Sequence, residues 1–244
     1  MFIVSECDTL LFDHPNLNFY QCVYDTDKYS PALYSHLGIE FPKQLSQAVY
    51  KRQASFLAGR YSAKQAMLRL GSSSQVYMGV NRNPIWPESI NGSISHTGDT
   101  ALCVTANKKT TPLIGIDVEN IVSASTASNI QKSIINDFER SLLQSYFNHI
   151  EIAFTLAFSA KESLFKTLYP ALNCFFDFTV AEIQEISIRD QKLVIRIVTD
   201  INNLKTSGLE FDCYFKIYEQ KIFTLVSYPH TLEITQLVKG ALHH

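Results

Sequence analysis

The sequence predicts an α+β protein built from two similar halves. Along the 244 residues, the expected elements follow in the order helix, strands, helices and again strands. A polar, serine-rich stretch at 120–133 separates the two series and is expected to be a linker or loop. We therefore expect an N-terminal α+β half over residues 1–119 and a C-terminal α+β half over residues 120–244.

In the first half, the pattern predicts a helix at 41–71 followed by three short strands. Val49, Phe56 and Ala63 fall near one helical face, and Gly71 suits a helix end. A loop rich in Pro, Asn and Gly separates this helix from the strands. The expected strands lie at 93–96, 100–106 and 112–119.

In the second half, two helical regions are expected at 133–149 and 151–170. Pro170 is expected to end the second helix, because proline lacks the N–H that continues the hydrogen-bond ladder. Alternating apolar residues at 179–200 and 209–229 then predict several antiparallel strands.

Composition excludes several classes of function. Hydrophobic residues make up 46% of the chain, which is enough for a proper core, and the net charge of −2 does not favour bulk binding to nucleic acid. No apolar run approaches the ~20 residues of a membrane-spanning helix, and the N-terminus lacks the basic start of a signal peptide. We expect a cytoplasmic protein, and the final His243 and His244, compatible with a tag remnant, are excluded from the interpretation.

Cysteine spacing points to a reducing compartment. The five cysteines show no CxxC pair, so we expect reduced core thiols and neither disulfides nor a zinc site. They are Cys7, Cys22, Cys103, Cys174 and Cys213.

Two carboxylates stand out in the strand "IGIDVEN" at 114–120. Asp117 and Glu119 are two residues apart, so on a strand they point to the same face. Carboxylates this close repel unless a cation neutralises them. They suit a hard divalent cation, although the residues are also compatible with a solvated edge strand.

The helix segment "FSAKESLFKTLYP" at 158–170 offers a third carboxylate. Glu162 and Lys166 are four residues apart and share a helical face, and Lys161 projects to the side of Glu162. Glu162 would complete a three-oxygen Mg²⁺ site, whose remaining ligands would be water and substrate phosphates. The structural alternative is a capping box, Ser159 with Glu162, and an ordinary ion pair.

Two further groups suit phosphate binding. Ser95 and His96 lie where a short strand enters a turn, so the hydroxyl, the imidazole and backbone N–H groups can bind phosphate. Arg52 and Arg60 are about two helical turns apart and can form a fork for a phosphate monoester. The alternatives are a turn-capping serine with a surface histidine, and solvated arginines.

Four motifs, taken together, resemble one enzyme family. The stretches "FLAGRYSAKQAM", "NPIWPESINGSISHTGDTALCV", "IGIDVEN" and "LAFSAKESLFKTLYP" occur in the order and spacing of the 4'-phosphopantetheinyl transferases of the surfactin-activator and enterobactin-synthetase-component-D type. The siderophore branch is the more similar. The resemblance covers roughly residues 50–170, and Ser55 departs from it, because relatives often carry Glu there.

The resemblance implies a pseudo-two-fold fold with the active site between the halves. It implies Mg²⁺ held by Asp117, Glu119 and Glu162, together with the pyrophosphate of coenzyme A. The residues implied to contact coenzyme A phosphates are Arg52, Arg60, Arg82, Ser95, His96, Lys161 and Lys166. Glu162, Lys161 and Lys166 are also the implied catalytic residues, and either Glu162 or Glu119 through a water would be the base.

The expected reaction follows from this resemblance. Coenzyme A would give its phosphopantetheine arm to a serine of an apo acyl, aryl or peptidyl carrier protein, releasing 3',5'-ADP, and the enzyme would be a monomer. An Mg²⁺-dependent nucleotide phosphohydrolase is the alternative enzyme, since carboxylates and basic residues suit it too. A non-catalytic module that binds coenzyme A is a third reading.

Overall fold

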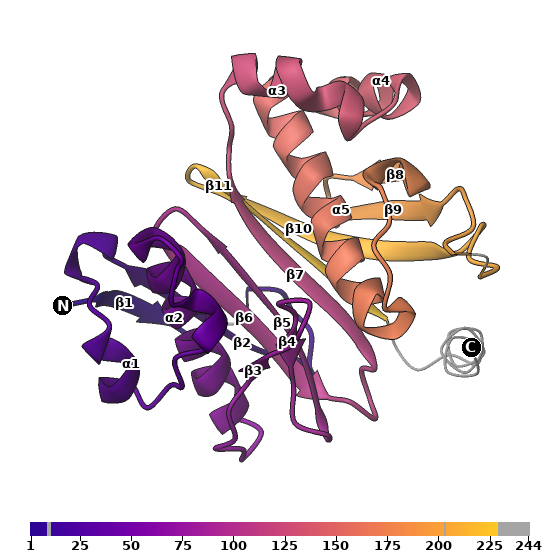
Figure 1. The fold of residues 1–244 in the computed structure, drawn as a ribbon. Coiled ribbons are helices and arrows are strands. Elements are labelled where there is room, and N and C mark those ends of the chain that lie inside the picture. Colours follow the sequence, from indigo (N-terminus) through magenta and orange to yellow (C-terminus); the bar gives the residue numbers. More distant parts are fainter. Residues whose placement is uncertain (9–10, 203, 229–244) are drawn as a thin grey trace. The chain divides into compact units, whose positions relative to one another are not determined.

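The computed structural model describes residues 1–8, 11–202 and 204–228, and its chain divides into two compact units, Met1–Pro112 and Leu113–His244 (Figure 1). Both units combine helices with antiparallel strands, which confirms the α+β class. None of the described helices is long and apolar enough to cross a membrane.

The first unit is an antiparallel sheet covered by one long helix. The sheet has the strand order β1-β2-β6-β5, and helix α2 packs on β6, β2 and β5 (Figure 1). The main elements are β1 (Ile3–Cys7), β2 (Asn18–Tyr24), α1 (Ala32–His36), α2 (Tyr50–Leu68), β5 (Ile90–Thr97) and β6 (Thr100–Asn107). The short strands β3 (Tyr77–Met78) and β4 (Pro84–Ile85) form a separate pair.

The second unit repeats this plan with a five-stranded antiparallel sheet in the order β7-β11-β10-β9-β8. Helix α5 packs along β7, β11 and β10, and α4 lies against β8 and α5 (Figure 1). The elements are β7 (Leu113–Asn120), α3 (Ala124–Ile130), α4 (Asp137–Tyr146), α5 (Ile150–Leu172), β8 (Ala181–Ser187), β9 (Lys192–Ile197), β10 (Glu210–Tyr218) and β11 (Lys221–Tyr228).

The strands predicted after residue 90 are confirmed, whereas β1 to β4 were not predicted and the helix boundaries differ from the prediction. The expected strands correspond to β5, β6 and β7 and, towards the C-terminus, to β8 to β11. The start of the helix predicted at 41–71 was wrong. Only a short 3₁₀ turn (Lys43–Leu45) forms there, and α2 begins at Tyr50, after an exposed Val49.

Two other expectations about helices were also wrong. The stretch at 120–133 is not an open linker but contains α3, because the Ser123 side chain accepts the Thr126 N–H and caps that helix. Helix α5 continues through Pro170, whose neighbours Tyr169 and Leu172 are buried in the core. The helix ends at Asn173, which adopts the left-handed conformation with φ 48°.

The strand "IGIDVEN" belongs to the sheet of the second unit. Residues of β7 pair with β11 over the whole strand, with Asp117 opposite Thr224 and Glu119 opposite Ile222. The compact division therefore falls before β7, at Pro112, whereas the sequence predicted it after Glu119. His243 and His244 lie outside the described residues.

Candidate active site

Helix α5 crosses strand β7 at a glycine. A Cβ atom added to Gly115 would lie 2.0 Å from the Ser163 backbone oxygen and 2.4 Å from Thr167 Oγ1. Only a residue without a side chain allows a helix backbone to come this close to a strand. Because Gly115 and Asp117 share a strand face, the same approach brings α5 over Asp117.

Asp117 is the buried centre of the arrangement, with an exposure of 1%. Ser159 Oγ of α5 donates to its Oδ2 at 2.8 Å, and Lys166 Nζ donates to its Oδ1 at 2.6 Å. Ser159 therefore does not cap a helix, since it lies in the middle of α5. Its hydroxyl also lies 2.9 Å from Thr224 Oγ1 of β11, so the serine is held in place.

Glu162 lies within electrostatic reach of this pair. Burial raises the pKa of Glu162, the charge of Lys166 lowers it, and the charge of Asp117 raises it again, with a net upward shift. Glu119, two residues beyond Asp117, is half-buried. Thus Asp117, Glu162 and Lys166 lie close together, but the ion pair between Lys166 and Asp117 was not predicted, since the sequence suggested that Lys166 pairs with Glu162 or contacts phosphate. Glu119 lies on the same strand face as Asp117.

The carboxylates fit a hard cation by donor chemistry, since Mg²⁺ prefers such oxygen ligands. The Lys166 ammonium on Asp117 Oδ1 shows that this carboxylate is directed at a cation. In 1–8, 11–202 and 204–228, however, no group of three or more His, Cys, Asp and Glu side chains is arranged to hold a metal ion.

Lys161 faces away from these groups. Its side chain is 1% exposed, and its ammonium donates to Ile134 O at 2.7 Å, Phe178 O at 3.2 Å and the Glu139 carboxylate at 3.0 Å. An ammonium has three hydrogens, so these partners use all of them. The expectation of a phosphate contact does not match this placement.

In the first unit, the structure joins Arg52 of α2 to His96 of β5. Arg52 Nη1 lies 2.9 Å from His96 Nε2. A guanidinium can only donate, so His96 Nε2 is the acceptor in this hydrogen bond. A cation and an imidazole on adjacent elements form a surface suited to a phosphate monoester.

Arg60 is a buried cation without a carboxylate partner in the described part of the chain. It is 8% exposed, its guanidinium lies 4.4 Å from the centre of the Phe56 ring, and Nη2 donates to Tyr77 O at 3.3 Å. Its Nε has no hydrogen-bond partner, and no carboxylate within the described ranges forms an ion pair with it. Burial, aided by the charge of Arg52, lowers the pKa of Arg60 to about 10. A buried guanidinium of this kind is suited to bind an anionic ligand.

Ser95 and Arg82 are the remaining predicted residues of this unit. Ser95 is 5% exposed on β5, beside His96 in the sequence. Arg82 is exposed in the turn between β3 and β4, with φ 63°, and its backbone N–H donates to Gly79 O. Among the described residues, no hydrogen bond or ion pair joins the Arg82 side chain to Arg52 or Arg60.

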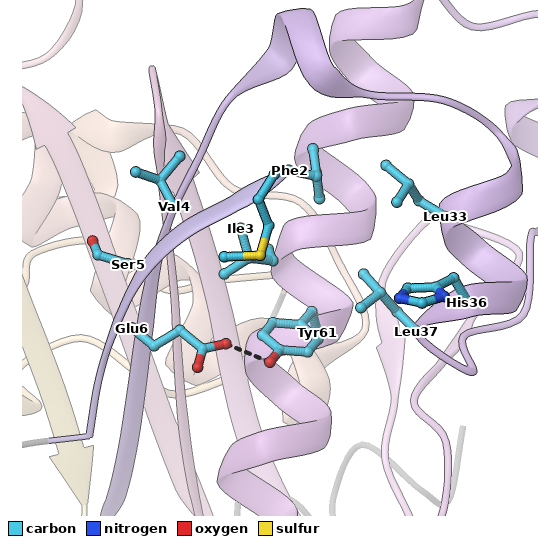
Figure 2. A pocket seen from close by; sticks show the side chains of 10 residues that line it. Phe2, Ile3, Val4, Ser5, Glu6, Leu33, His36, Leu37 and Tyr61 are labelled. Atoms are coloured by element: carbon cyan, nitrogen blue, oxygen red, sulfur yellow. Dashed lines mark hydrogen bonds between the residues drawn. The ribbon is translucent and has the colours of Figure 1, made fainter.

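Cavities in the described part of this unit include two of different size. One of about 280 Å³ includes Phe56 and Tyr77, the two residues that Arg60 contacts. The other, of about 680 Å³, lies between β1 and α1, where Glu6 accepts a hydrogen bond from Tyr61 (Figure 2). None of the predicted site residues lines the larger cavity.

Sequence reasoning missed the contributions of Gly115, Ser159 and Phe56. A glycine inside an apolar strand is a recognised signal of close backbone approach, so Gly115 had a usable signal. Ser159 and Phe56 had none, because their roles depend on contacts between separate elements.

Two family models together match most of the chain. Residues 41–106 match the family model "4'-phosphopantetheinyl transferase N-terminal domain", and residues 113–221 match "4'-phosphopantetheinyl transferase superfamily". These two matched ranges contain every residue predicted for the site.

Three relatives illustrate the similarity. Enterobactin synthase component D of Salmonella typhimurium is 40% identical over 144 residues, covering 59% of this chain and 60% of the relative. The protein of the same name from Escherichia coli O157:H7 is 35% identical over 182 residues, covering 75% and 80%. The 4'-phosphopantetheinyl transferase Npt of Nocardia iowensis is 28% identical over 140 residues, covering 57% and 62%. The chain thus matches about 60% of the length of the Salmonella typhimurium relative and 51% of that from Salmonella typhi.

Proposed function

The chain belongs to the 4'-phosphopantetheinyl transferase superfamily, and we propose that it transfers the 4'-phosphopantetheine arm of coenzyme A to a serine of an apo carrier protein. The observation that carries this proposal is the buried Asp117 carboxylate, hydrogen-bonded to Lys166 and within electrostatic reach of Glu162. In this cluster, the Lys166 ammonium can balance charge on a diphosphate, and a carboxylate can accept a proton.

The proposed reaction is a phosphoryl transfer. The carrier serine hydroxyl attacks the phosphorus that bears the pantetheine arm, a new O–P bond forms, and the P–O bond to 3',5'-ADP breaks. Glu162 accepts the hydroxyl proton, since its raised pKa makes it a better base than an ordinary carboxylate. Glu119 acting through a water is the alternative base.

Lys166 is proposed to balance the charge that develops on the leaving 3',5'-ADP. Phosphoryl transfer depends mainly on positioning and charge neutralisation, so a fixed ammonium is suited to this role. Ser159 holds Asp117 in one orientation, which keeps the carboxylate directed at its cation.

We propose that Asp117, Glu119 and Glu162 hold Mg²⁺ together with the diphosphate. When bound, Mg²⁺ would neutralise charge on the diphosphate oxygens. This assignment is supported by the oxygen donors and by the cation contact at Asp117.

Coenzyme A also carries a 3'-phosphate and an adenine ring. We propose that Arg52, Arg60 and His96 bind the 3'-phosphate, with Ser95 and Arg82 as further contacts. The burial of Arg60 without an ion-pair partner among the described residues supports an anionic ligand. The aromatic cavity that includes Phe56 is suited to a nucleotide base.

The acceptor is proposed to be a carrier domain of a siderophore or nonribosomal peptide synthetase. This extends to the chain what the name "Enterobactin synthase component D" says of its relatives. We also propose that the enzyme is cytoplasmic, in keeping with its free thiols, and that it is a monomer, since both halves belong to one chain.

Intact-mass spectrometry tests the proposal. The protein is incubated with coenzyme A, Mg²⁺ and apo forms of aryl, peptidyl and acyl carrier domains. We expect the mass of one phosphopantetheine arm on at least one carrier, and its loss when EDTA replaces Mg²⁺. Coenzyme A cleaved without any carrier gaining mass would instead support the phosphohydrolase. Intact coenzyme A with unmodified carriers would contradict both enzymes.

A further inference from the structure

Lys161 and Glu139 form a buried ion pair that the proposed reaction does not use. Both side chains are 1% exposed, and Lys161 Nζ lies 2.8 Å from Glu139 Oε1 and 3.0 Å from Oε2. Burying two charges is costly unless they are paired and their hydrogens are satisfied. Here both conditions hold, because the ammonium also donates to the Ile134 and Phe178 carbonyls.

Both oxygens of the Glu139 carboxylate also accept backbone hydrogen bonds. Oε1 accepts the Ile183 N–H of β8 at 3.0 Å, and Oε2 accepts the Asn136 N–H at 3.0 Å as half of the capping box of α4. The pair therefore connects α5 to the start of α4, to β8 and to the segments that contain Ile134 and Phe178.

This connection lies on the side of α5 away from the candidate site. An α-helix turns by about 100° per residue, so Lys161 lies about 200° around the axis from Ser159 and about 140° from Lys166. Ser159 and Lys166 bind Asp117, while Ser163 Oγ donates to Thr224 O at 3.0 Å. The helix is thus held from two nearly opposite sides.

We infer that Lys161 is a positioning residue, which fixes the rotation of α5 about its axis through Glu139 and does not contact phosphate. Glu162 follows Lys161 directly, so a rotation of α5 would move Glu162 relative to Asp117. This inference rests on the proposed function for the roles of Glu162 and Lys166. The anchoring contact itself does not depend on those roles.

Lysine acetylation of the native protein tests the placement. The protein is treated with an amine-reactive acetyl ester, with and without coenzyme A and Mg²⁺, and the modified peptides are quantified by mass spectrometry. Because it is buried, Lys161 should react about tenfold or more slowly than the surface residue Lys192, whether or not coenzyme A is present. Reaction of Lys161 in the free protein, followed by protection with coenzyme A, would overturn the inference.

Three variants test the mechanism: Lys161→Met, Glu139→Gln and the two combined. Lys161→Met leaves a buried carboxylate unpaired and should lower the Tm by about 10 °C. Adding Glu139→Gln removes that charge and should restore at least half of the loss. Additive losses would show that the two residues do not act as a pair.

Turnover then separates positioning from direct contact. It is measured on a carrier at a temperature where circular dichroism shows every variant folded. For Lys161→Met we expect kcat to fall about tenfold with the coenzyme A KM within threefold, and Glu139→Gln should partly restore kcat in the combined variant. A raised KM that is not restored would indicate a phosphate contact, and normal kcat in folded Lys161→Met would indicate a purely structural role. Either result overturns the inference.

Failure of the native protein to modify any carrier would reject the proposed function, while acetylation and Tm would still decide the anchoring contact.

Discussion

Lys166 Nζ donates to Asp117 Oδ1 at 2.6 Å, which joins α5 to β7 across 49 positions of sequence. The Asp117 carboxylate is buried, whereas the Lys166 side chain keeps an exposure of 24%. A partly exposed cation on a buried carboxylate can be displaced by, or can share its charge with, an incoming ligand. This relationship leads to the first prediction.

Asp117→Asn should abolish carrier modification, with a loss of at least about a hundredfold in kcat/KM. The amide keeps the shape of the side chain but cannot balance a cation. The matched control is Asp212→Asn, since Asp212 also pairs with a lysine, Lys192 at 3.2 Å, but at the surface. Carrier mass is the measurement, and near-native rates in Asp117→Asn would contradict the role of this carboxylate.

Gly115→Ala should destabilise the protein strongly. The new methyl would overlap the Ser163 carbonyl at 2.0 Å, so α5 must move away from β7. Overpacking typically costs about 1–3 kcal/mol, and a clash with backbone should lie at the upper end. Chemical denaturation measures the free energy of unfolding.

The control for this glycine is Gly71→Ala. Gly71 has open space around it but adopts φ 73°, so alanine there costs only backbone strain. An equal loss in the two variants would show that close helix–strand approach is not what Gly115 provides.

Glu162→Gln should stabilise the metal-free protein at neutral pH while removing its activity. Burial and the Asp117 charge raise the pKa of Glu162 above its usual 4.5, so the folded state holds this proton more tightly than the unfolded state. Stability is therefore lost as pH rises from the usual value through the raised pKa. The glutamine variant avoids this loss, so its Tm should exceed that of the native protein above this window and match it below.

The measurement is Tm between about pH 4 and pH 8 in EDTA, because linkage predicts a pH-dependent difference. Glu219→Gln is the control at an exposed carboxylate. A constant Tm difference across the pH range would contradict the raised pKa of Glu162.

Arg60→Gln should weaken coenzyme A binding and leave the chemical step nearly intact. Loss of a buried cation facing an anionic ligand should raise the coenzyme A KM about tenfold or more, with kcat within about threefold. The control is Arg196→Gln, whose guanidinium pairs with Glu210 at the surface. A fall in kcat at unchanged KM would show that Arg60 does not act in ground-state binding.

Several elements could be predicted from the sequence because their signals are local. Strand β7 carries β-branched residues on both sides of Asp117, and the alternation of side chains fixed the common face of Asp117 and Glu119. The four-residue spacing of Glu162 and Lys166 likewise fixed their common side of α5. Helix ends were harder to predict, since α5 continues beyond Pro170 in the packed structure.

By itself, the sequence determined the α+β class, the strands of both sheets after residue 90, and the types and spacing of the site's carboxylates and cations. Only the tertiary structure decided which neighbours those charges have. Lys161 and Glu162 are adjacent in the chain, yet helical rotation and packing direct the lysine into a buried pair with Glu139 and leave Glu162 within reach of Asp117. Burial also left Arg60 without a carboxylate partner among the described residues, which no spacing of residues predicts. The physical reason is that desolvation and ion pairing depend on contacts between distant segments, whereas periodicity records only local geometry.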